Sequence, residues 1–310
     1  MATQSVTLTN SALIAGGDGG NGGKGGGLTP QSIYLDGSGS GGNGGSGGVA
    51  IYLQAGGVID NSGTLQGGNG GDGGNVPDCC YIEPDGKQVG GSNGNGGNGG
   101  AGISASGATI TNIGTIMGGD GGDSGIGGVG YPIYIYGQSK LGDGGDGGDG
   151  IVGNNLTIMN SGTIRGGTGG APGNGVAGKD GYAIRFQGGT NRLELHAGSD
   201  ITGIVWASTS GSNTFILGGD TDATFAANIT SVGVVNGSAQ YYGFQTNEKT
   251  GTSTWSLTGR SEDWTIKQGV LQIGDGGTKG EITGTVNTGP DANNKGTFAF
   301  NRSDAILFGG

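Results

Sequence analysis

The sequence is poor in the residues that build an ordinary globular core. Hydrophobic residues make up 31% of its 310 residues and aromatic residues 6%, whereas a globular chain is typically about 45–50% apolar. A large compact core is therefore excluded. Basic residues are also scarce, with 13 Lys+Arg against 24 Asp+Glu and a net charge of −11. This balance argues against nucleic acid or an anionic membrane surface as a partner, since both require clustered positive charge.

Other absences narrow the function classes. The two cysteines, Cys79 and Cys80, are adjacent, so no long disulfide loop can close within the chain. With 6 prolines and no sustained Gly-X-Y period, collagen is excluded. No apolar run approaches the roughly 18–20 residues of a membrane span, so we expect no direct membrane insertion of this segment. The single histidine, His196, is not accompanied by a sequence motif that would supply a catalytic nucleophile. We therefore expect a protein that is not an enzyme.

Glycine is abundant, with 84 residues. Four similar segments, each of which begins with an asparagine and is expected to form a sharp corner, precede a Gly-Gly pair at nearly fixed spacing. The corner asparagines are Asn10, Asn61, Asn112 and Asn160, at spacings of 51, 51 and 48 residues. Such a period predicts stacked repeats that bury their apolar edges against one another. We expect the asparagines and glycines of these segments to supply the left-handed backbone that a sharp corner requires. We also expect the asparagines to form a stacked ladder and the Ile or Leu after each corner to point inward.

Short β-branched runs between the glycine tracts predict strands and argue against a purely disordered chain, the alternative for such a composition. The expected strands before residue 200 cover 6–8, 32–35, 50–53, 109–111, 132–136, 156–159, 183–186 and 193–195. No window shows helical periodicity, so the chain reads as all-β. We expect an elongated, right-handed parallel β-helix, with a two-domain Ig-like sandwich as the structural alternative.

The tracts follow a Gly-Gly-X pattern whose natural conformation is the extended helix with three residues per turn. That helix places every X on one face, for example Asp18, Asn21 and Lys24 in residues 16–27. Two readings remain open. The tracts either pack in order, like polyglycine II, on one side of the solenoid, or they project as mobile loops.

Residues 1–200 form the glycine-rich repeat region, and residues 201–310 recover normal strand density. In the second region, 269–274, 276–278, 280–284 and 296–304 resemble the passenger repeats of bacterial autotransporters, most specifically at Phe300-Asn301-Arg302-Ser303-Asp304. The resemblance implies right-handed β-helix rungs and a passenger segment without that family's C-terminal membrane barrel. It also implies an extracellular location on the bacterial outer-membrane surface and a role in cell adhesion and virulence.

Segments that interrupt the glycine pattern are the candidate binding sites, because insertions in repeat folds often form the binding face. The insertion from Asn75 to Val89 supplies five candidates, and a second interruption supplies two alternating tyrosines: Cys79, Cys80, Tyr81, Glu83 and Asp85, then Tyr134 and Tyr136. A vicinal disulfide would stiffen the first segment. The plainer readings are a tolerated insertion and ordinary tyrosine stacking between rungs.

One stretch matches a calcium-binding repeat. Residues 144–152 fit the nonapeptide of calcium-binding β-rolls, with Asp146 and Asp149 as the candidate calcium ligands. The match stands alone, however, and a solvated acidic face is the simpler reading. No other cofactor is expected.

These features together predict a secreted, surface-displayed adhesin. Its partner would be a host-cell surface protein or glycan, or like chains through self-association. A phage-type receptor-binding tip is the alternative from another class, and an ice-binding protein built from polyglycine helices is a further one. A polysaccharide lyase would need acidic and basic residues along one groove, which the sequence lacks.

Overall fold

The computed structural model describes residues 6–26, 39–76, 91–126, 142–173, 175–232, 239–289 and 295–304. Every strand pairing in these ranges is parallel, and the described residues contain no helix. The all-β prediction with parallel sheets is confirmed. The alternative of an Ig-like sandwich is wrong, because the sheets of such a sandwich are antiparallel, whereas those of this chain are parallel.

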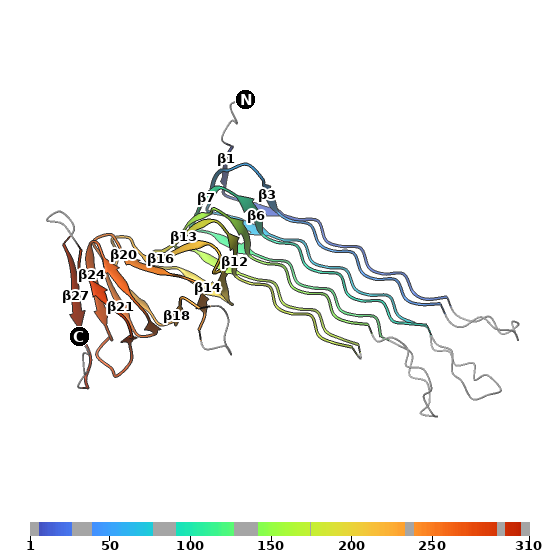
Figure 1. The fold of residues 1–310 in the computed structure, drawn as a ribbon. Coiled ribbons are helices and arrows are strands. Elements are labelled where there is room, and N and C mark those ends of the chain that lie inside the picture. The colour runs from blue at the N-terminus through green and yellow to red at the C-terminus, as the bar shows by residue number, and fades with distance from the viewer. Residues whose placement is uncertain are drawn as a thin grey trace, which may run out of the picture.

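Successive strands join three large sheets in rotation (Figure 1). The first sheet contains, in spatial order, β1 (Thr7–Asn10), β4 (Gly57–Asn61), β7 (Ala108–Asn112), β10 (Thr157–Asn160), β13 (Thr190–Leu195), β16 (Ser212–Leu217), β20 (Thr246–Lys249), β23 (Trp264–Ile266) and β26 (Val286–Asn287). The second contains β14 (Asp200–Thr202), β11 (Thr163–Arg165), β8 (Thr115–Met117), β5 (Thr64–Gln66) and β2 (Leu13–Ala15).

The third sheet contains β18 (Ile229–Thr230), β19 (Tyr241–Tyr242), β15 (Val205–Ala207), β12 (Ile184–Gly188), β9 (Ile151–Asn154), β6 (Ile103–Ser106) and β3 (Ile51–Leu53). Two smaller sheets follow, with β17 (Ala223–Phe225), β21 (Thr254–Leu257), β24 (Gly269–Ile273) and β27 (Gly296–Phe300) in one and β22 (Arg260–Ser261) and β25 (Glu281–Ile282) in the other. Each of the first four repeats, β1–β3, β4–β6, β7–β9 and β10–β12, therefore adds one strand to each large sheet. The first and third sheets continue past residue 200 without a break.

A narrow column of aliphatic side chains fills the space between the sheets. Equivalent positions of successive repeats stack in register, so that Ile59, Ile110 and Ile158 lie above one another and are fully buried. The Leu or Ile after each corner also points inward, as predicted, with Leu65, Ile116 and Ile164 fully buried. Each repeat thus hides its apolar residues only against its neighbours, which is how stacked repeats gain stability.

The corner asparagines form the predicted ladder. Asn10 Nδ2 donates to Asn61 Oδ1 at 2.8 Å, Asn61 Nδ2 to Asn112 Oδ1 at 2.8 Å, and Asn112 Nδ2 to Asn160 Oδ1 at 2.7 Å. All four side chains are buried. Each buried asparagine side chain therefore finds a hydrogen-bond partner in the equivalent asparagine of a neighbouring repeat.

The expected left-handed backbone at these corners is wrong. Among the described non-glycine residues only Asn155, with φ of 51°, has positive φ, and the corner glycines Gly63, Gly114 and Gly162 do not have it either. Glycine is required at these positions because the backbone of the preceding corner lies too close for a Cβ atom. A Cβ on Gly114 would lie 2.2 Å from the carbonyl oxygen of Gly63, and one on Gly162 would lie 2.2 Å from that of Gly114.

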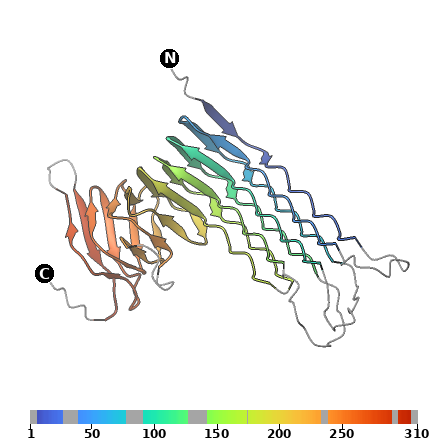
Figure 2. The ribbon, with the colours of Figure 1, turned by 45° about the vertical axis from the view of Figure 1, so that its right-hand side comes forward.

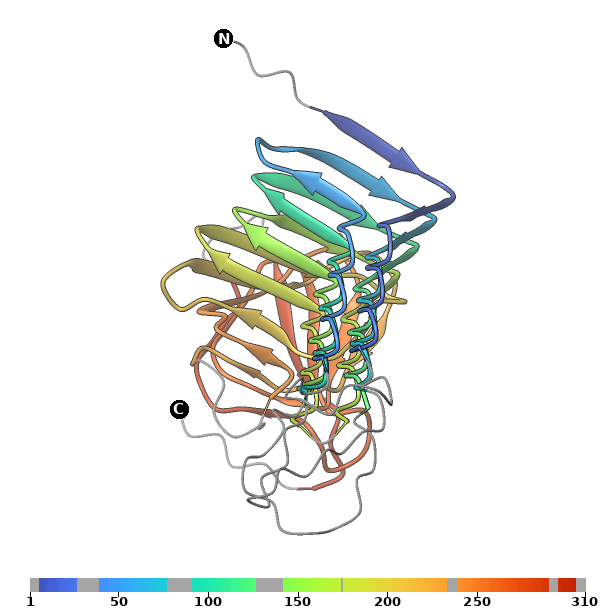
Figure 3. The same ribbon diagram turned by 90° about the vertical axis from the view of Figure 1, so that its right-hand side faces the viewer.

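The glycine tracts extend away from the strands and lie side by side on one side of the molecule (Figures 1 and 2). Four outward tracts, residues 16–26, 67–75, 118–126 and 166–173, leave the second sheet, and four return tracts, residues 39–49, 91–101, 142–150 and 175–182, lead into the third. Viewed along the tracts, the two kinds form two adjacent columns (Figure 3). We call this assembly of eight tracts the glycine bundle.

Every N–H group of an interior Gly-Gly-X triplet has its own kind of acceptor. The first glycine donates to an X carbonyl in the next repeat, as Gly70 does to Asp120 at 2.8 Å. The second glycine donates to a tract of the other column, as Gly71 does to Gly45 at 2.8 Å. The N–H of X donates to the side chain of X in the preceding repeat, as Asp120 does to Asn69 Oδ1 at 2.9 Å. These three kinds of hydrogen bond hold the tracts in an ordered array.

We predict that alanine is tolerated only at the outer edge of the bundle. A Cβ on Gly71 would lie 2.2 Å from the carbonyl oxygen of Gly20, so Gly71→Ala should lower the free energy of unfolding by about 3 kcal/mol or more. Gly20, at the equivalent position of the first tract, has nothing within 4 Å of a Cβ. Gly20→Ala should therefore be neutral or stabilising by up to about 1 kcal/mol. Chemical denaturation of the two variants makes the comparison, and equal losses would contradict it.

We also predict that the asparagine ladder is a major source of stability. Asn112→Ala removes three donated bonds, to Asn160 Oδ1 and to the carbonyls of Gly114 and Thr163. The loss should be about 2–3 kcal/mol, because the remaining groups stay buried without partners. Ile113→Ala is the matched control, since the neighbouring Ile113 side chain is 64% exposed and should change stability by less than about 0.5 kcal/mol. If Asn112→Ala has the same melting temperature as Ile113→Ala, the ladder is not a major source of stability.

Candidate functional site

The X residues of the bundle form two polar faces, one on each column. Their oxygens accept bonds from the next repeat, so Asp18, Asn69 and Asp120 form one row and Asn43, Asn95 and Asp143 another. In the middle of the tracts these positions hold Asp, Asn or Ser, whose acceptors lie near the backbone, whereas Lys24, Val49, Ala101 and Ile126 occupy X positions at tract ends. The acidic residues of these rows are thus committed to holding tracts together, which also accounts for much of the excess of carboxylates.

Asp146 and Asp149, the candidate calcium ligands, belong to this pattern. Asp146 Oδ1 accepts the N–H of Lys179 at 2.7 Å, and Asp149 Oδ1 accepts the N–H of Tyr182 at 3.0 Å. Across the described ranges, no three His, Cys, Asp or Glu side chains lie close enough together to hold a metal ion. The same ranges contain no helix long and apolar enough to cross a membrane.

Asp149 lies at the base of the bundle, where the tracts meet the strands, close to an arginine and two aromatic side chains. Its Oδ2 accepts from Arg185 Nε at 2.7 Å, and Arg185 Nη2 lies 2.5 Å from the same oxygen. Burial raises the pKa of Asp149, although Arg185 acts in the opposite direction. The Arg185 guanidinium also lies 5.8 Å from the centre of the Tyr182 ring, and Tyr182 lies 6.2 Å from Trp206.

These three side chains, Tyr182, Arg185 and Trp206, form what we call the basal cluster. All three are half-buried, and Arg185 and Trp206 are direct neighbours on β12 and β15. Tyr, Trp and Arg are the residues that most often anchor protein interfaces. The sequence pattern does not predict this cluster, because two strands, β13 and β14, separate Trp206 from the other two residues. Tyr182 departs from the Asp/Asn/Ser pattern of the X positions, but Val49 and Ala101 do so at the equivalent place, so this signal was weak.

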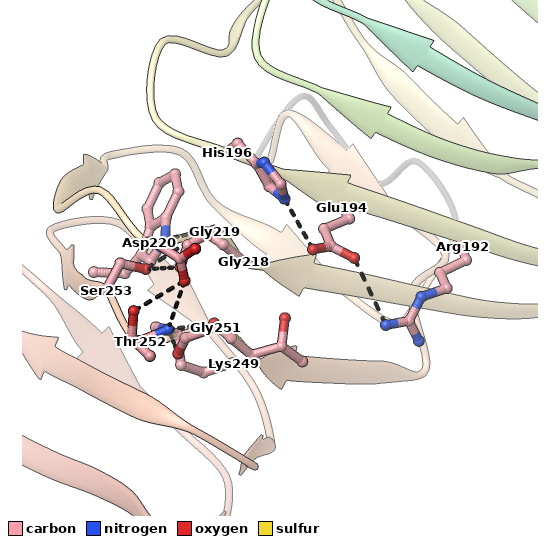
Figure 4. A network of polar contacts seen from close by, with 12 residues as sticks. Arg192, Glu194, His196, Gly218, Gly219, Asp220, Lys249, Gly251, Thr252 and Ser253 are labelled. Atoms are coloured by element: carbon pink, nitrogen blue, oxygen red, sulfur yellow. Dashed lines mark hydrogen bonds and ion pairs between the residues drawn. The ribbon is translucent and has the colours of Figure 1, made fainter. Parts of the chain in front are cut away.

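A second polar network lies on the first sheet (Figure 4). Glu194 Oε1 lies 2.9 Å from His196 Nε2, and Glu194 Oε2 lies 3.8 Å from Arg192 Nη2. Glu248 on β20, two strands further along the sheet, binds Arg192 at 3.4 Å and Lys267 at 2.7 Å. His196, directly after β13, is thus paired with a carboxylate of that strand, within a row of ion pairs whose carboxylates are more buried than their basic partners. The expectation of a non-enzymatic protein stays a prediction.

Lys249 is the most unusual titratable side chain of this region. It is fully buried, and its Nζ donates to the carbonyls of Thr250, Gly251 at 3.0 Å and Gln268 at 3.4 Å. Burial lowers its pKa to about 8, while the nearby Asp222 and Asp220 act in the opposite direction. Asp220 is itself bound to the hydroxyl of Thr252 at 2.9 Å, which lowers the pKa of Asp220.

The candidate residues that interrupt the glycine pattern, Cys79, Cys80, Tyr81, Glu83, Asp85, Tyr134 and Tyr136, lie outside the described residues. The tract ends on either side of them are described. Gly25 N–H donates to Asn75 at 2.9 Å, Gly94 to Gly74 at 3.0 Å, and Gly125 to Gly94 at 2.8 Å. The chain therefore enters and leaves these segments at one place, the end of the bundle far from the strands. We call it the distal end.

Comparison with known proteins adds no relative. No protein-family model, no curated protein and no solved structure matches the chain.

We predict that the buried lysine makes stability rise with pH in the alkaline range. The pKa of Lys249 is about 8 in the folded chain against 10.5 ordinarily, so between these values the unfolded chain binds more protons and unfolding becomes harder as pH rises. From pH 8 to about 9.5 the free energy of unfolding should increase by about 2 kcal/mol. Above this range the tyrosines reverse the trend, since burial raises the pKa of Tyr241.

Denaturant titrations of the wild type and of Lys249→Met across this pH range make the measurement. The variant should lose the rise and keep a flat profile. Parallel profiles for the two proteins would show that Lys249 is not its source.

Proposed function

We propose that this chain is a non-enzymatic passenger segment on the outer surface of a bacterium, where it acts as an adhesin or a self-association stalk. We infer that its parallel strands wind as an elongated right-handed β-helix and that its tracts adopt polyglycine II-like geometry. Support comes from the rotation of strands among three parallel sheets and from the resemblance of 269–304 to autotransporter passenger repeats.

The observation that carries the proposal is the junction at the distal end. Three segments without the glycine pattern, residues 27–38, 77–90 and 127–141, are attached there to six tract ends that are hydrogen-bonded to one another. A tract of ten residues in this conformation is about 31 Å long. The bundle is thereby suited to hold variable segments at a fixed distance from the strands. In such an arrangement side-chain diversity is concentrated where a partner, a host-cell protein or glycan, would make contact.

A phage-type receptor-binding tip is the second candidate, and the glycine bundle favours it as strongly as it favours an adhesin. The two differ in the gene neighbourhood, where a translocating barrel or a tail-fibre operon would decide. An ice-binding role is less favoured, because both faces of the bundle carry charged X residues such as Asp72 and Asp146 rather than a uniform neutral surface.

We predict that deleting residues 76–88 and joining the flanking tracts abolishes or strongly reduces cell attachment while leaving the strands folded. Loop length affects stability only weakly, whereas loss of an aromatic anchor such as Tyr81 should cost about 2 kcal/mol or more of binding free energy. A cell-binding assay beside a melting curve makes the measurement. Tyr81→Ala within the intact chain is the finer variant.

If attachment and melting are both unchanged, this segment is not the binding site, and Tyr134→Ala with Tyr136→Ala is then the next test. Trp206→Ala tests the basal cluster in the same assay. Loss of attachment in this variant alone would move the binding site from the distal end to the base of the bundle.

A further inference from the structure

Five X residues of the glycine bundle are asparagines followed directly by glycine, and they share one local sequence. Each stands in the sequence Gly-Asn-Gly-Gly, and the five are Asn21, Asn43, Asn69, Asn95 and Asn98. An Asn-Gly pair is where asparagine loses its side-chain amide most readily, because glycine has no side chain to shield the backbone nitrogen that follows. Since the neighbours are identical, any difference in reactivity among the five has to come from the structure.

The reaction joins the backbone nitrogen of the glycine to Cγ of the asparagine. The peptide N–H gives its proton to the solvent, the new N–Cγ bond closes a five-membered succinimide ring, and the Cγ–Nδ2 bond breaks, so that the amide nitrogen leaves as ammonia. Water then opens the ring at either carbonyl and gives aspartate or isoaspartate. The peptide group must first rotate until its nitrogen faces Cγ, so hydrogen bonds that hold the peptide group also slow the reaction.

In the three interior pairs the peptide group is held from both sides. The carbonyl of Asn69 accepts the N–H of Gly19 at 2.8 Å, and the N–H of the glycine after Asn69 donates to the carbonyl of Asp120 at 2.8 Å. Asn69 Oδ1 accepts the N–H of Asp120 at 2.9 Å, which holds the side chain as well. Asn95 and Asn98 make the same three bonds with the repeats on either side of them.

The two pairs of the first repeat lack one of these bonds. The N–H of the following glycine donates to the second repeat, at 2.7 Å after Asn21 and at 2.8 Å after Asn43, and both side chains accept from that repeat too. Among the described residues, however, no N–H group donates to the carbonyl of Asn21 or of Asn43. Beside Asn21 the outer side also has room, since a Cβ on Gly20 or Gly23 would meet nothing within 4 Å.

Solvent exposure alone would give a different order of reactivity. Asn98 is exposed, like Asn21 and Asn43, whereas Asn69 and Asn95 are half-buried. If access of water decided the rate, Asn98 would react together with the two asparagines of the first repeat. If the hydrogen bonds of the peptide group decide it, Asn98 is protected. Asn98 therefore separates the two explanations.

We propose that Asn21 and Asn43 are sites of spontaneous deamidation in the folded chain, and that the bundle protects Asn69, Asn95 and Asn98 from it. At the first repeat one backbone hydrogen bond fewer has to break before the peptide group can turn, and such a bond is worth roughly a factor of five in an equilibrium. Local opening at the edge of a structure is also easier than opening in its interior.

The two products have different effects on the first tract. Aspartate in place of Asn21 keeps the oxygen that accepts the N–H of Asp72, and the bundle already has aspartate at the equivalent positions Asp72 and Asp123. Isoaspartate leads the main chain through Cγ and adds one carbon atom to the backbone. The three-residue period is then broken, so Gly22 and Gly25 lose register with their acceptors in the second tract. Deamidation to isoaspartate thus releases the distal end of the first tract.

Peptide mass spectrometry of the full chain, incubated in the folded state at mildly alkaline pH, is the direct test. Asn21 and Asn43 should deamidate at least about fivefold faster than Asn69, Asn95 and Asn98. In denaturant all five should react at one rate, because their neighbours are identical, so each site supplies its own control. Five equal rates in the folded chain, or a rate at Asn98 that equals those of Asn21 and Asn43, would overturn the proposal.

A stiffer first tract gives a second test. A Cβ on Gly20 meets nothing within 4 Å, so Gly20→Ala keeps the fold and reduces the freedom of the opened tract. The rate at Asn21, divided by its rate in denaturant, should fall about two- to fivefold, while that at Asn43 stays unchanged. An unchanged rate at Asn21 would show that opening of this tract does not control the reaction, against the proposal.

Hydrogen exchange on the aged protein tests the consequence. Molecules with isoaspartate in place of Asn21 should exchange the N–H groups of Gly22 and Gly25 faster, while Gly70 and Gly73 of the second tract stay protected. Freshly prepared Asn21→Asp is the matched control, because it carries the same charge without the extra backbone carbon, and it should exchange like the wild type. Equal exchange in the isoaspartate form and in Asn21→Asp would overturn the release of the tract.

Discussion

The close approach of bare backbones in the glycine bundle is the constraint on which the rest of this structure depends. A Cβ on the first glycine of an interior triplet, such as Gly70 or Gly99, would lie 1.9 Å from a carbonyl oxygen of the other column. The second glycine is pressed just as tightly against the preceding repeat, and the third position alone has room for a side chain. In the middle of the tracts that side chain also accepts the N–H of the next X residue, as Asn69 does from Asp120. The geometry therefore requires two glycines, and a short acceptor at the third position adds a hydrogen bond, which accounts for the Gly-Gly-Asn and Gly-Gly-Asp triplets.

This arrangement changes what holds the chain together along its length. Up to about residue 182 the strands bury one narrow aliphatic column, and the bundle is stabilised by backbone hydrogen bonds with almost no apolar burial. Beyond the last tract, aromatic side chains take over the core. Phe215 lies 5.1 Å from Tyr241, 5.2 Å from Phe225 and 5.7 Å from Phe244 between ring centres. The shift in composition near residue 200 thus reflects a change from hydrogen-bonded repeats to aromatic packing within continuous sheets.

The sequence was sufficient for features that repeat and insufficient for those that occur once. The spacing of Asn61, Asn112 and Asn160 predicted the ladder, and the triplet pattern predicted that Asp18, Asn21 and Lys24 share a face. The reason for the corner glycines was misjudged, because steric pressure from a neighbouring repeat leaves no signature distinct from that of positive φ. The basal cluster was not predictable, since the contact of Arg185 with Asp149 and of Tyr182 with Trp206 depends on how the last return tract meets β12. Calcium at Asp146 and Asp149 stays a prediction, although one oxygen of each carboxylate also accepts a backbone N–H group of the next repeat.

A bundle of this kind also dictates where recognition chemistry is possible. In the middle of a tract the X residue presents an acceptor to the next repeat, and these positions hold Asp, Asn or Ser. In the last repeat no further tract follows, and the X positions hold Thr168, Ala171, Val176, Lys179 and Tyr182 instead. Other side chains occur at X positions in the final repeat and at the tract ends, where Lys24, Val49, Ala101 and Ile126 stand. The basal cluster includes one residue of the final repeat, Tyr182. A partner of the bundle would meet varied side chains at these places, whereas the mid-tract Asp and Asn side chains also hold the tracts together.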